Sequence, residues 1–294
     1  MWRCLNCCGC DPAVAVFSEI LLARMPPPHA AEAEYPPAFL RMAELLLHGT
    51  TLRVAGVPHR LTEIEFYVNG PGHRDPFIHG DPMQKKGGFW YFHRTGGRYR
   101  SGTYKGLDIA IGNEDLFGGI LIRGVEQLEP LPRRLDGPCI CVDHLLALNR
   151  APSIEQLVAR FDGKIDAPTG GESPLSLEVA AAPRKQPIFA CPRVGLTLKR
   201  SASEERQKFL ARPYRFLSEP KAIKKGKPNL VTALHRAGRS VPEIVALSGA
   251  PKASVVRYVA AFESGKGRPA EQYREELSSE QLCELFGACD HLLA

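Results

Sequence analysis

Five short segments of apolar or alternating residues, divided by glycine-rich turns, constrain this chain most. They lie at residues 51–56, 59–68, 87–94, 104–112 and 118–128. Alternation with a period of two is typical of strands that bury one face, and short connections favour antiparallel pairing. The sequence therefore predicts an antiparallel sheet across this region.

Helical patterns surround these strands. Apolar residues at helical spacing in 38–49 predict a helix that stops at Gly49, and 137–149 and 154–161 predict two more. Residues 162–187 read as a long loop with at most one short element. Residues 189–199 predict a strand, and 209–217 a last strand or turn. The predicted fold class is α+β, a single domain at 38–217 around a curved antiparallel sheet.

The two ends of the chain differ from this domain. Residues 1–37 carry four cysteines and many prolines, so we expect a disordered tail, with 23–37 as its linker. Adjacent cysteines fit poorly around one tetrahedral zinc ion. A disordered tail is therefore favoured over a metal site, and reversible acylation is a further alternative. The four cysteines are Cys4, Cys7, Cys8 and Cys10.

Residues 218–294 form a separate unit in this interpretation. A basic linker precedes three short helical patterns, and the second opens with Ser240 followed by Glu243, a capping box, and ends at Gly249. This arrangement predicts a helix-turn-helix. Lys252 and Arg257 on the third helix would lie along DNA, or the helices would simply pack on the main domain. A further helix is expected at 275–287.

Composition narrows the function classes only slightly. The 294 residues are 44% hydrophobic with a formal net charge of +6, and no run of about 18 apolar residues occurs. We expect a soluble, intracellular protein, nuclear if its source is eukaryotic. A mildly basic chain is compatible with a nucleic-acid partner without demonstrating one.

Polar residues interrupt the predicted strands. In LTEIEFYV, Glu63, Glu65 and Tyr67 share one strand face, and Arg123 lies inside ILIRGV. A buried charge needs a partner, so we expect Arg123 to meet a carboxylate or a phosphate. Several such residues in one sheet favour a shared cleft over separate structural ion pairs.

Six motifs occur in one order along the chain: HRLTEIEFY with a histidine about a dozen residues later, an aromatic strand, GILIRGVEQLE, LDGPCICVDHLLAL, PRVGL and ARPYRFL. In this order and spacing, from about Leu45 to Leu217, the sequence resembles the alkyladenine (methylpurine) DNA glycosylase family. The resemblance implies a monofunctional DNA-3-methyladenine-glycosylase-like hydrolase of base-excision repair. Its expected partner is double-stranded DNA with a damaged base, and the expected protein is a monomer that needs no metal or cofactor.

The resemblance also implies roles for individual residues. Glu65 matches the catalytic glutamate, and Arg123 the arginine that holds the water and the DNA backbone beside it. Tyr67 and His79 match two walls of the base pocket, and Phe92 the third wall, where the family usually has tyrosine. In this mechanism the enzyme flips the base out of the helix, and Glu65 activates the water that replaces it. Glu63 is then a structural or solvated charge at the strand's edge.

Two departures from the family pattern stand out. Asp108 replaces the pocket asparagine that excludes the exocyclic amine of guanine, so we expect an altered lesion preference. If Asp108 lay within about 6 Å of Glu65, its charge would raise the glutamate's pKa. The hairpin at 94–106 is longer than the family's turn. Tyr99, expected at its tip between Arg98 and Arg100, suits a DNA wedge, although an ordinary exposed hairpin remains the alternative.

Three other interpretations remain open. A non-catalytic protein on the same fold could recognise damaged DNA, with the helix-turn-helix as its main reader. A hydrolase of free nucleosides would not need the basic hairpin. His73, Asp75 and Asp81, close to His79, suggest a metal site in spacing alone, but hydrogen bonding within the loop is favoured over it.

Overall fold

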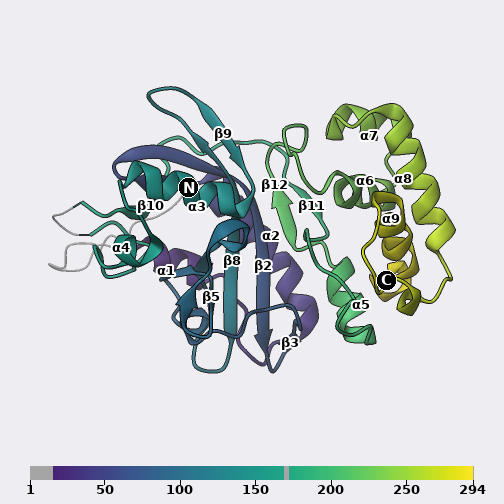
Figure 1. Ribbon diagram of the computed structural model, residues 1–294, viewed down its shortest axis with the longest axis horizontal. Coiled ribbons are helices and arrows are strands. Elements are labelled where there is room, and N and C mark those ends of the chain that lie inside the picture. The colour runs from purple at the N-terminus through teal and green to yellow at the C-terminus, as the bar shows by residue number, and fades with distance from the viewer. Residues whose placement is uncertain (1–15, 169–171, 294) are drawn as a thin grey trace, which may run out of the picture.

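An antiparallel sheet of ten strands forms the centre of the chain (Figure 1). The computed structural model describes residues 16–168 and 172–293. The long central strand β2 pairs with β8 along most of its length, and the main path runs β10-β1-β2-β8-β7-β4. The strands of this sheet are β1 (Thr50–Val54), β2 (Val57–Gly70), β3 (His73–Arg74), β4 (Trp90–Phe92), β7 (Leu107–Ala110), β8 (Phe117–Gln127), β9 (Arg133–Asp136), β10 (Leu175–Val179), β11 (Phe189–Cys191) and β12 (Arg215–Leu217); β5 (Arg94–Thr95) and β6 (Arg98–Tyr99) form a separate hairpin.

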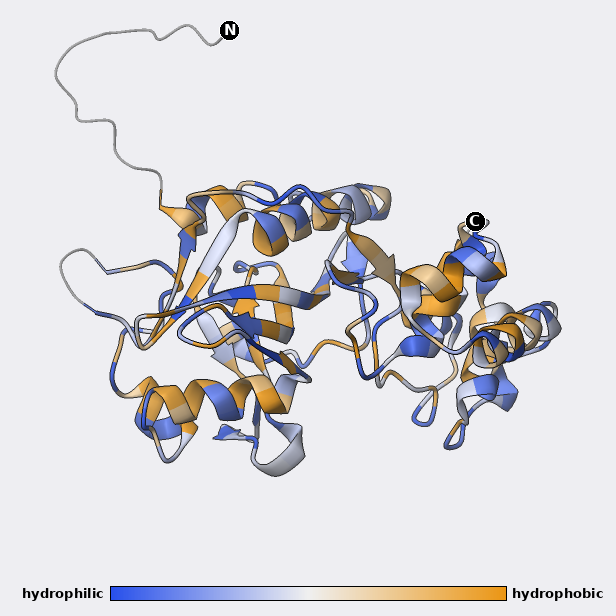
Figure 2. Ribbon diagram, turned by 90° about the horizontal axis from the view of Figure 1, so that it is seen from above, coloured by the Kyte–Doolittle hydropathy of each residue, from blue (hydrophilic) through white to orange (hydrophobic). Residues whose placement is uncertain are grey.

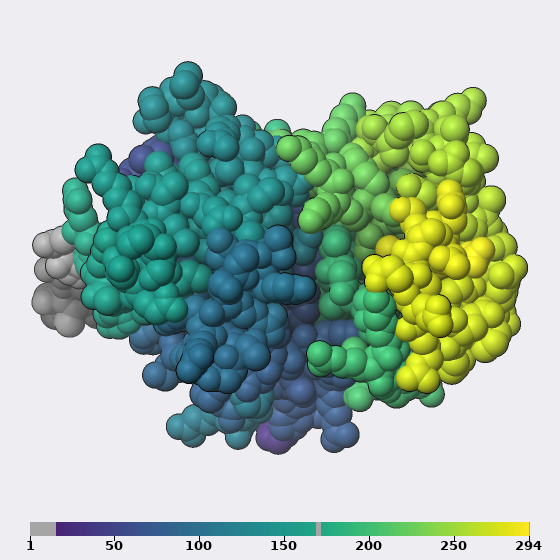
Figure 3. All heavy atoms as spheres, viewed as in Figure 1, coloured from purple at the N-terminus to yellow at the C-terminus, as the bar shows by residue number. Residues whose placement is uncertain are grey.

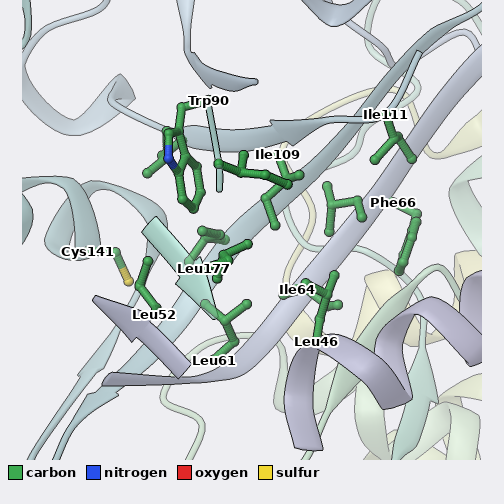
Figure 4. Packing of buried hydrophobic residues seen from close by; sticks show 14 of the residues in the cluster. Leu46, Leu52, Leu61, Ile64, Phe66, Trp90, Ile109, Ile111, Cys141 and Leu177 are labelled. Carbon is green, nitrogen blue, oxygen red and sulfur yellow. The ribbon is translucent and has the colours of Figure 1, made fainter. Parts of the chain in front are cut away.

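The predicted mixed α and β class is thus confirmed, together with the antiparallel sheet. One face of the sheet packs on a helix, with Ile64 and Phe66 of β2 pointing into the core toward Leu46 (Figure 4). The ring of Phe66 stacks on Phe39 with centroids 4.5 Å apart. Burying each such side chain contributes about 1.5–3 kcal/mol. Since successive residues alternate in direction, the residues between them face the opposite side.

The helices largely follow the sequence pattern. The predictions at 38–49, 137–149 and 154–161 correspond to α2, α3 and α4, while the described part of the long loop contains the strand β10. The segment 209–217 is different: its first residues end a helix, α5, and only its last three form a strand, β12. The helices are α1 (Phe17–Leu22), α2 (Tyr35–His48), α3 (Pro138–Leu148), α4 (Ile154–Val158), α5 (Glu204–Ala211), α6 (Lys227–Arg236), α7 (Val241–Ser248), α8 (Lys252–Gly265) and α9 (Ser279–Ala288).

The expected tail of residues 1–37 is wrong from Val16 onward. Phe17 and Leu21 of α1 are buried in the main core, and Glu32 forms ion pairs with α5 and the residue that follows it. The helix α2 begins at Tyr35 rather than near Ala38, because its two prolines lie in the first turn, where proline is tolerated. The cysteines at positions 4–10 lie outside the described residues, and the prediction for them stays untested.

The helices α6 to α9 form a C-terminal helical unit that lies beside the sheet (Figures 1 and 3). Seen from above and coloured by hydropathy, apolar stretches of these helices face one another (Figure 2). The capping box is present, since the backbone NH of Ser240 donates to Glu243 at 2.8 Å. The core of this unit also takes in Cys191 and Leu217 from the main sheet, so the unit is packed on the sheet and not simply tethered to it.

Within residues 16–168 and 172–293, no helix is both long enough and apolar enough to cross a lipid bilayer.

Candidate functional site

One row of side chains crosses the sheet on the face away from α2. Glu65 of β2 is paired with Leu121 of β8, which is paired with Asp108 of β7, and Asp108 is paired with Tyr91 of β4. Directly paired residues in antiparallel strands share a face. The register therefore brings together side chains from four strands that are up to 56 residues apart in sequence.

A cavity of about 370 Å³ lies along this row. Its walls combine aromatic rings, imidazoles, a carboxylate and cationic side chains, a mixture that suits a flat polar ligand such as a purine. Two predicted wall residues, Tyr67 and His79, line it, as does Asp108. The lining residues are Tyr67, Phe77, His79, Gln84, His93, Arg100, Thr103, Tyr104, Lys105, Asp108, Leu121, Pro138, Val194, Gly195 and Leu196.

Glu65 lies behind this wall and is fully buried. Its carboxylate accepts hydrogen bonds from the Tyr67 hydroxyl at 2.8 Å and from the backbone NH of Val194 at 2.8 Å. The Nε of Arg123 lies 3.3 Å from the same carboxylate. Burial and the neighbouring Glu65 raise the pKa of Tyr67 well above its usual value, so the phenol stays protonated and donates. Two cavity residues thus touch Glu65 directly.

Glu63 is also buried and is part of the same network of charges. It accepts from Arg123 Nε at 2.7 Å and from Arg215 Nε at 2.8 Å. Although burial opposes ionisation, these two guanidinium groups hold the pKa of Glu63 below its usual range. The alternative of a solvated charge is therefore wrong, and the structural role is confirmed. The predicted carboxylate partner of Arg123 is confirmed as well.

A second buried pair completes the network. Arg193, in the loop after β11, forms an ion pair with Asp75, and both side chains have no exposed surface. Its guanidinium also lies over the Tyr67 ring, 4.3 Å from the centroid, a cation–π contact. Sequence reasoning quoted the segments that carry Arg193 and Arg215 but gave neither residue a role. Their signal was an arginine inside an otherwise apolar strand or strand end, the same signal that identified Arg123.

The third predicted wall of the pocket is wrong. Phe92 is in the hydrophobic core and is 2% exposed. Successive residues of a strand point to opposite faces, so Phe92 faces the core while the residues before and after it face the other side. Its neighbour His93 lines the cavity instead, and the Tyr91 hydroxyl lies 3.5 Å from Nδ1 of His79. The His93 ring meets the His79 ring edge-on with centroids 4.4 Å apart. Burial, followed by the proximity of His93, lowers the pKa of His79 to about 4, so this wall is neutral at pH 7.

Asp108 pairs with His93 rather than with Glu65. The His93 Nε2 lies 2.6 Å from the Asp108 carboxylate. Glu65 and Asp108 are on strands two apart in the sheet, a backbone separation of roughly 10 Å. The backbones of the two residues are therefore farther apart than the 6 Å considered above. Gly119 leaves room for the carboxylate, since a Cβ there would lie 2.5 Å from Asp108 Oδ2.

The hairpin does not present Tyr99 as predicted. Its tip is the glycine pair at 96–97, and the Tyr99 ring packs against Phe92 at the edge of the core. The exposed aromatic residue of this region is Tyr104, 75% exposed on the rim of the cavity. Of the two arginines expected to grip phosphates, Arg98 is exposed and Arg100 lines the cavity.

The side chains considered for a metal site have other partners. His73 contacts the carbonyl of Val68 and the Tyr214 hydroxyl, and Asp81 pairs with Arg94. Asp75 is the partner of Arg193, as described above. These contacts reach beyond the loop to other elements of the fold. Among the residues that the structure describes, no group of three or more His, Cys, Asp or Glu side chains is placed to hold a metal ion.

A pair of histidines away from the cavity gives the fold a pH dependence. His59 donates from Nδ1 to the Val57 carbonyl, so its Nε2 accepts from His144 at 2.9 Å, and both rings are neutral. Burial lowers the pKa of His59, and burial together with His59 lowers that of His144 to about 4. Unfolded histidine titrates near 6.5. The stability that this neutral pair contributes is therefore fully present above about pH 6.5 and is lost as the pH falls toward 4.

We expect the melting temperature to drop between pH 7 and pH 5, measured by thermal unfolding in circular dichroism. A His144→Gln variant keeps a donor for His59 but lacks one titrating group, so its drop over this range should be smaller. Equal drops in the two proteins would show that the pair does not control the acid response.

Comparison with known proteins finds a viral relative of this chain. No protein-family model matches the chain. The uncharacterized protein L759 of Acanthamoeba polyphaga mimivirus is 33% identical over 214 residues, which cover 65% of this chain and 91% of the viral protein. This chain therefore belongs to the same protein family as the mimivirus protein.

Proposed function

We propose that the protein is a DNA glycosylase of base-excision repair that removes alkylated or otherwise damaged purines from duplex DNA. One observation carries the proposal. A buried carboxylate, Glu65, is held between Arg123 and the pocket wall residue Tyr67, beside a cavity of about 370 Å³. A purine between aromatic and imidazole walls would bring its sugar carbon toward this carboxylate. The family resemblance supports the same assignment.

The chemistry follows from this geometry. Arg123 lies beside the Glu65 carboxylate, which would accept a proton from water as the oxygen attacks the sugar carbon. The glycosidic bond breaks at the same time through an oxocarbenium-like state, and the base leaves with the bonding electrons. An N-alkylated purine already carries positive charge, so one carboxylate suffices. The reaction requires only water as co-reactant.

The test is direct. The full-length protein would be incubated with duplexes that contain hypoxanthine, ethenoadenine or an N-alkylated purine, and abasic sites would be cleaved by alkali and counted on a gel. Cleavage at the lesion position alone would support the proposal. No abasic sites with any of these lesions, for a protein that binds the duplexes, would overturn it.

A specific observation favours a second candidate function, a non-catalytic protein that binds damaged DNA. Glu65 has no exposed surface, and Tyr67, Val194 and Arg123 enclose its carboxylate. A water would reach it only after Tyr67 or the loop at Val194 moves. In this alternative the same cavity holds an extruded base, and the carboxylate serves only to balance the buried arginines.

Asp108 is expected to set the choice between lesions. Its carboxylate on the cavity wall can accept a hydrogen bond from an exocyclic amine, whereas the amide of an Asp108→Asn variant can also donate. We expect the variant to change the ratio of guanine to adenine lesions removed, by about 10-fold for one such hydrogen bond. The ratio would be measured by parallel single-turnover assays. An unchanged ratio would remove Asp108 from lesion recognition.

A further inference from the structure

The charges of the C-terminal part of the chain are sharply divided. Between Lys221 and Arg257 there are eight Lys and Arg residues and one carboxylate, Glu243, whereas residues 258–294 contain three Lys and Arg and seven carboxylates. The net charge of +2 for 218–294 hides this division. Two ion pairs cross this division, Arg236 with Asp290 and Arg257 with Glu280, whereas Lys221, Lys224 and Lys225 of the linker are exposed. An exposed basic segment points to an anionic partner.

The basic segment has the geometry of a helix-turn-helix. Three residues join α7 to α8, and Gly249 at the end of α7 has φ +66°, the left-handed conformation that glycine favours. Lys227 fixes the linker to this turn, because its Nζ donates to the carbonyls of both Ser248 and Lys221. The backbone of Lys221 lies against Gly249. The linker lysines and the start of α8 are therefore held together.

One face of α8 is exposed to solvent within the described chain. Arg257 on this face pairs with Glu280 of α9 at 2.9 Å, in an ion pair whose side chains are 58% and 46% exposed. The buried residues of α8 face α6, α7 and α9, and the close approach of α9 at Gly265 and Gly287 leaves no space on that side. The outward residues recur at helical spacing, and Val256 is 48% exposed, unusual for an aliphatic side chain. This outward face consists of Lys252, Ala253, Val256, Arg257 and Ala260.

We propose that α8 binds in the major groove of duplex DNA, with the linker lysines on adjacent phosphates. A helix with its side chains is about 10–12 Å wide, and the groove is about 12 Å wide. The small and apolar Ala253 and Val256 allow close approach and contact with thymine methyl groups, while Lys252 and Arg257 supply the charge. This surface is separate from the cavity, and its binding of DNA does not depend on base excision.

The same linker connects this surface to the cavity. The backbone NH of Lys224 donates to the carboxylate of Asp136, two residues before Pro138 on the cavity rim. Lys105, which is ion-paired with Asp143, also lies on that rim. In this proposal one continuous duplex contacts the cavity rim, the linker and α8 together. Binding through α8 then holds the cavity against the duplex even where the DNA carries no lesion.

The proposal is tested by fluorescence anisotropy with the full chain and a lesion-free 24-base-pair duplex, at 50–300 mM salt. The double variant Lys252→Glu/Arg257→Glu should bind about 10–100-fold more weakly at 100 mM salt, and the slope of log K against log[salt] should fall by about two. The matched control Lys266→Glu/Arg274→Glu makes the same charge change in the acidic half and should stay within about twofold of the wild type.

Two results would overturn the proposal: equal losses in the two double variants, or single-stranded DNA of the same length bound as tightly as the duplex. Lys252→Gln/Arg257→Gln gives a second measurement if charge reversal prevents folding, with the same direction expected. Excision at saturating protein, measured on the lesion duplexes above, reports on the pocket separately. Duplex binding by a protein that never cleaves a lesion would leave this inference intact and remove only the glycosylase function.

Discussion

Replacing Glu65 with glutamine is expected to lower the single-turnover rate of base excision by about 10²–10⁴-fold, the usual contribution of a general base. Glutamine has nearly the same shape: its amide oxygen can accept from the backbone NH of Val194, and its NH2 group can donate to the Tyr67 hydroxyl, which turns to accept, so the pocket is preserved. It cannot take the proton from water. Binding to the lesion duplex should therefore remain within a few-fold of the wild type, as measured by anisotropy.

Glu63→Gln is the matched control for this substitution. Glu63 lies on the same strand, is equally buried and contacts the same Arg123, but its other partner is Arg215 and it does not touch a cavity residue. Both variants remove one negative charge from the network, so both should lose stability to a similar extent. Equal losses of excision in the two variants would show that the Glu65 carboxylate is only structural. A rate for Glu65→Gln within about threefold of the wild type would remove it from catalysis.

The sequence predicted the strand of Glu63 and Glu65 correctly, because alternation is a local property of the chain. Side chains in a strand alternate between its two faces, so whether a residue number is odd or even (its parity) gives its face. The shared face of Glu63, Glu65 and Tyr67 therefore follows without tertiary information. The alternation did not predict whether that face is buried or exposed to solvent. The expected solvated edge is a buried network, because β8 and β12 flank β2 on both sides at this point.

Phe92 was assigned to the pocket from its position in the family pattern, and not from the alternation of residues along the strand, and this caused the error. Residues 90–93 alternate between core and site, and parity alone puts Phe92 with Trp90 in the core and His93 with Tyr91 opposite. The family pattern fixed the strand but not its exact register. A slip of one residue exchanges the two faces completely. His93 could have been found from parity together with the expectation that Asp108 faces the cavity.

Other parts of the site depend on contacts that are distant in sequence. Arg193 meets Asp75 across 118 residues, and Arg215 meets Glu63 across 152. No local pattern predicts such pairs, although a buried arginine does predict that some partner exists. The hairpin failed for a different reason: an aromatic residue between two arginines looks exposed, yet Tyr99 packs on Phe92, a contact that pattern alone cannot show.

The buried pair of Arg193 and Asp75 is expected to produce the largest stability effect. Asp75→Asn removes the carboxylate that pairs with Arg193 and leaves a guanidinium with no exposed surface, hydrogen-bonded to the carbonyls of Phe66 and Phe209. Removing one partner of a buried pair costs about 3–5 kcal/mol, because the remaining charge stays out of water. We expect this loss in the free energy of unfolding from urea titration at pH 7.

Glu178→Gln provides the matched comparison, since it makes the same chemical change in an ion pair with Arg53 whose side chains are both 39% exposed. Solvent screens that pair, and its loss should cost at most about 1 kcal/mol. The two substitutions differ mainly in burial, so the difference between their losses in free energy of unfolding measures the effect of burying the ion pair. A loss below about 1 kcal/mol for Asp75→Asn would mean that Arg193 regains water or another partner. The Tyr67 wall, on which its guanidinium lies, would then be less rigid than the base pocket requires.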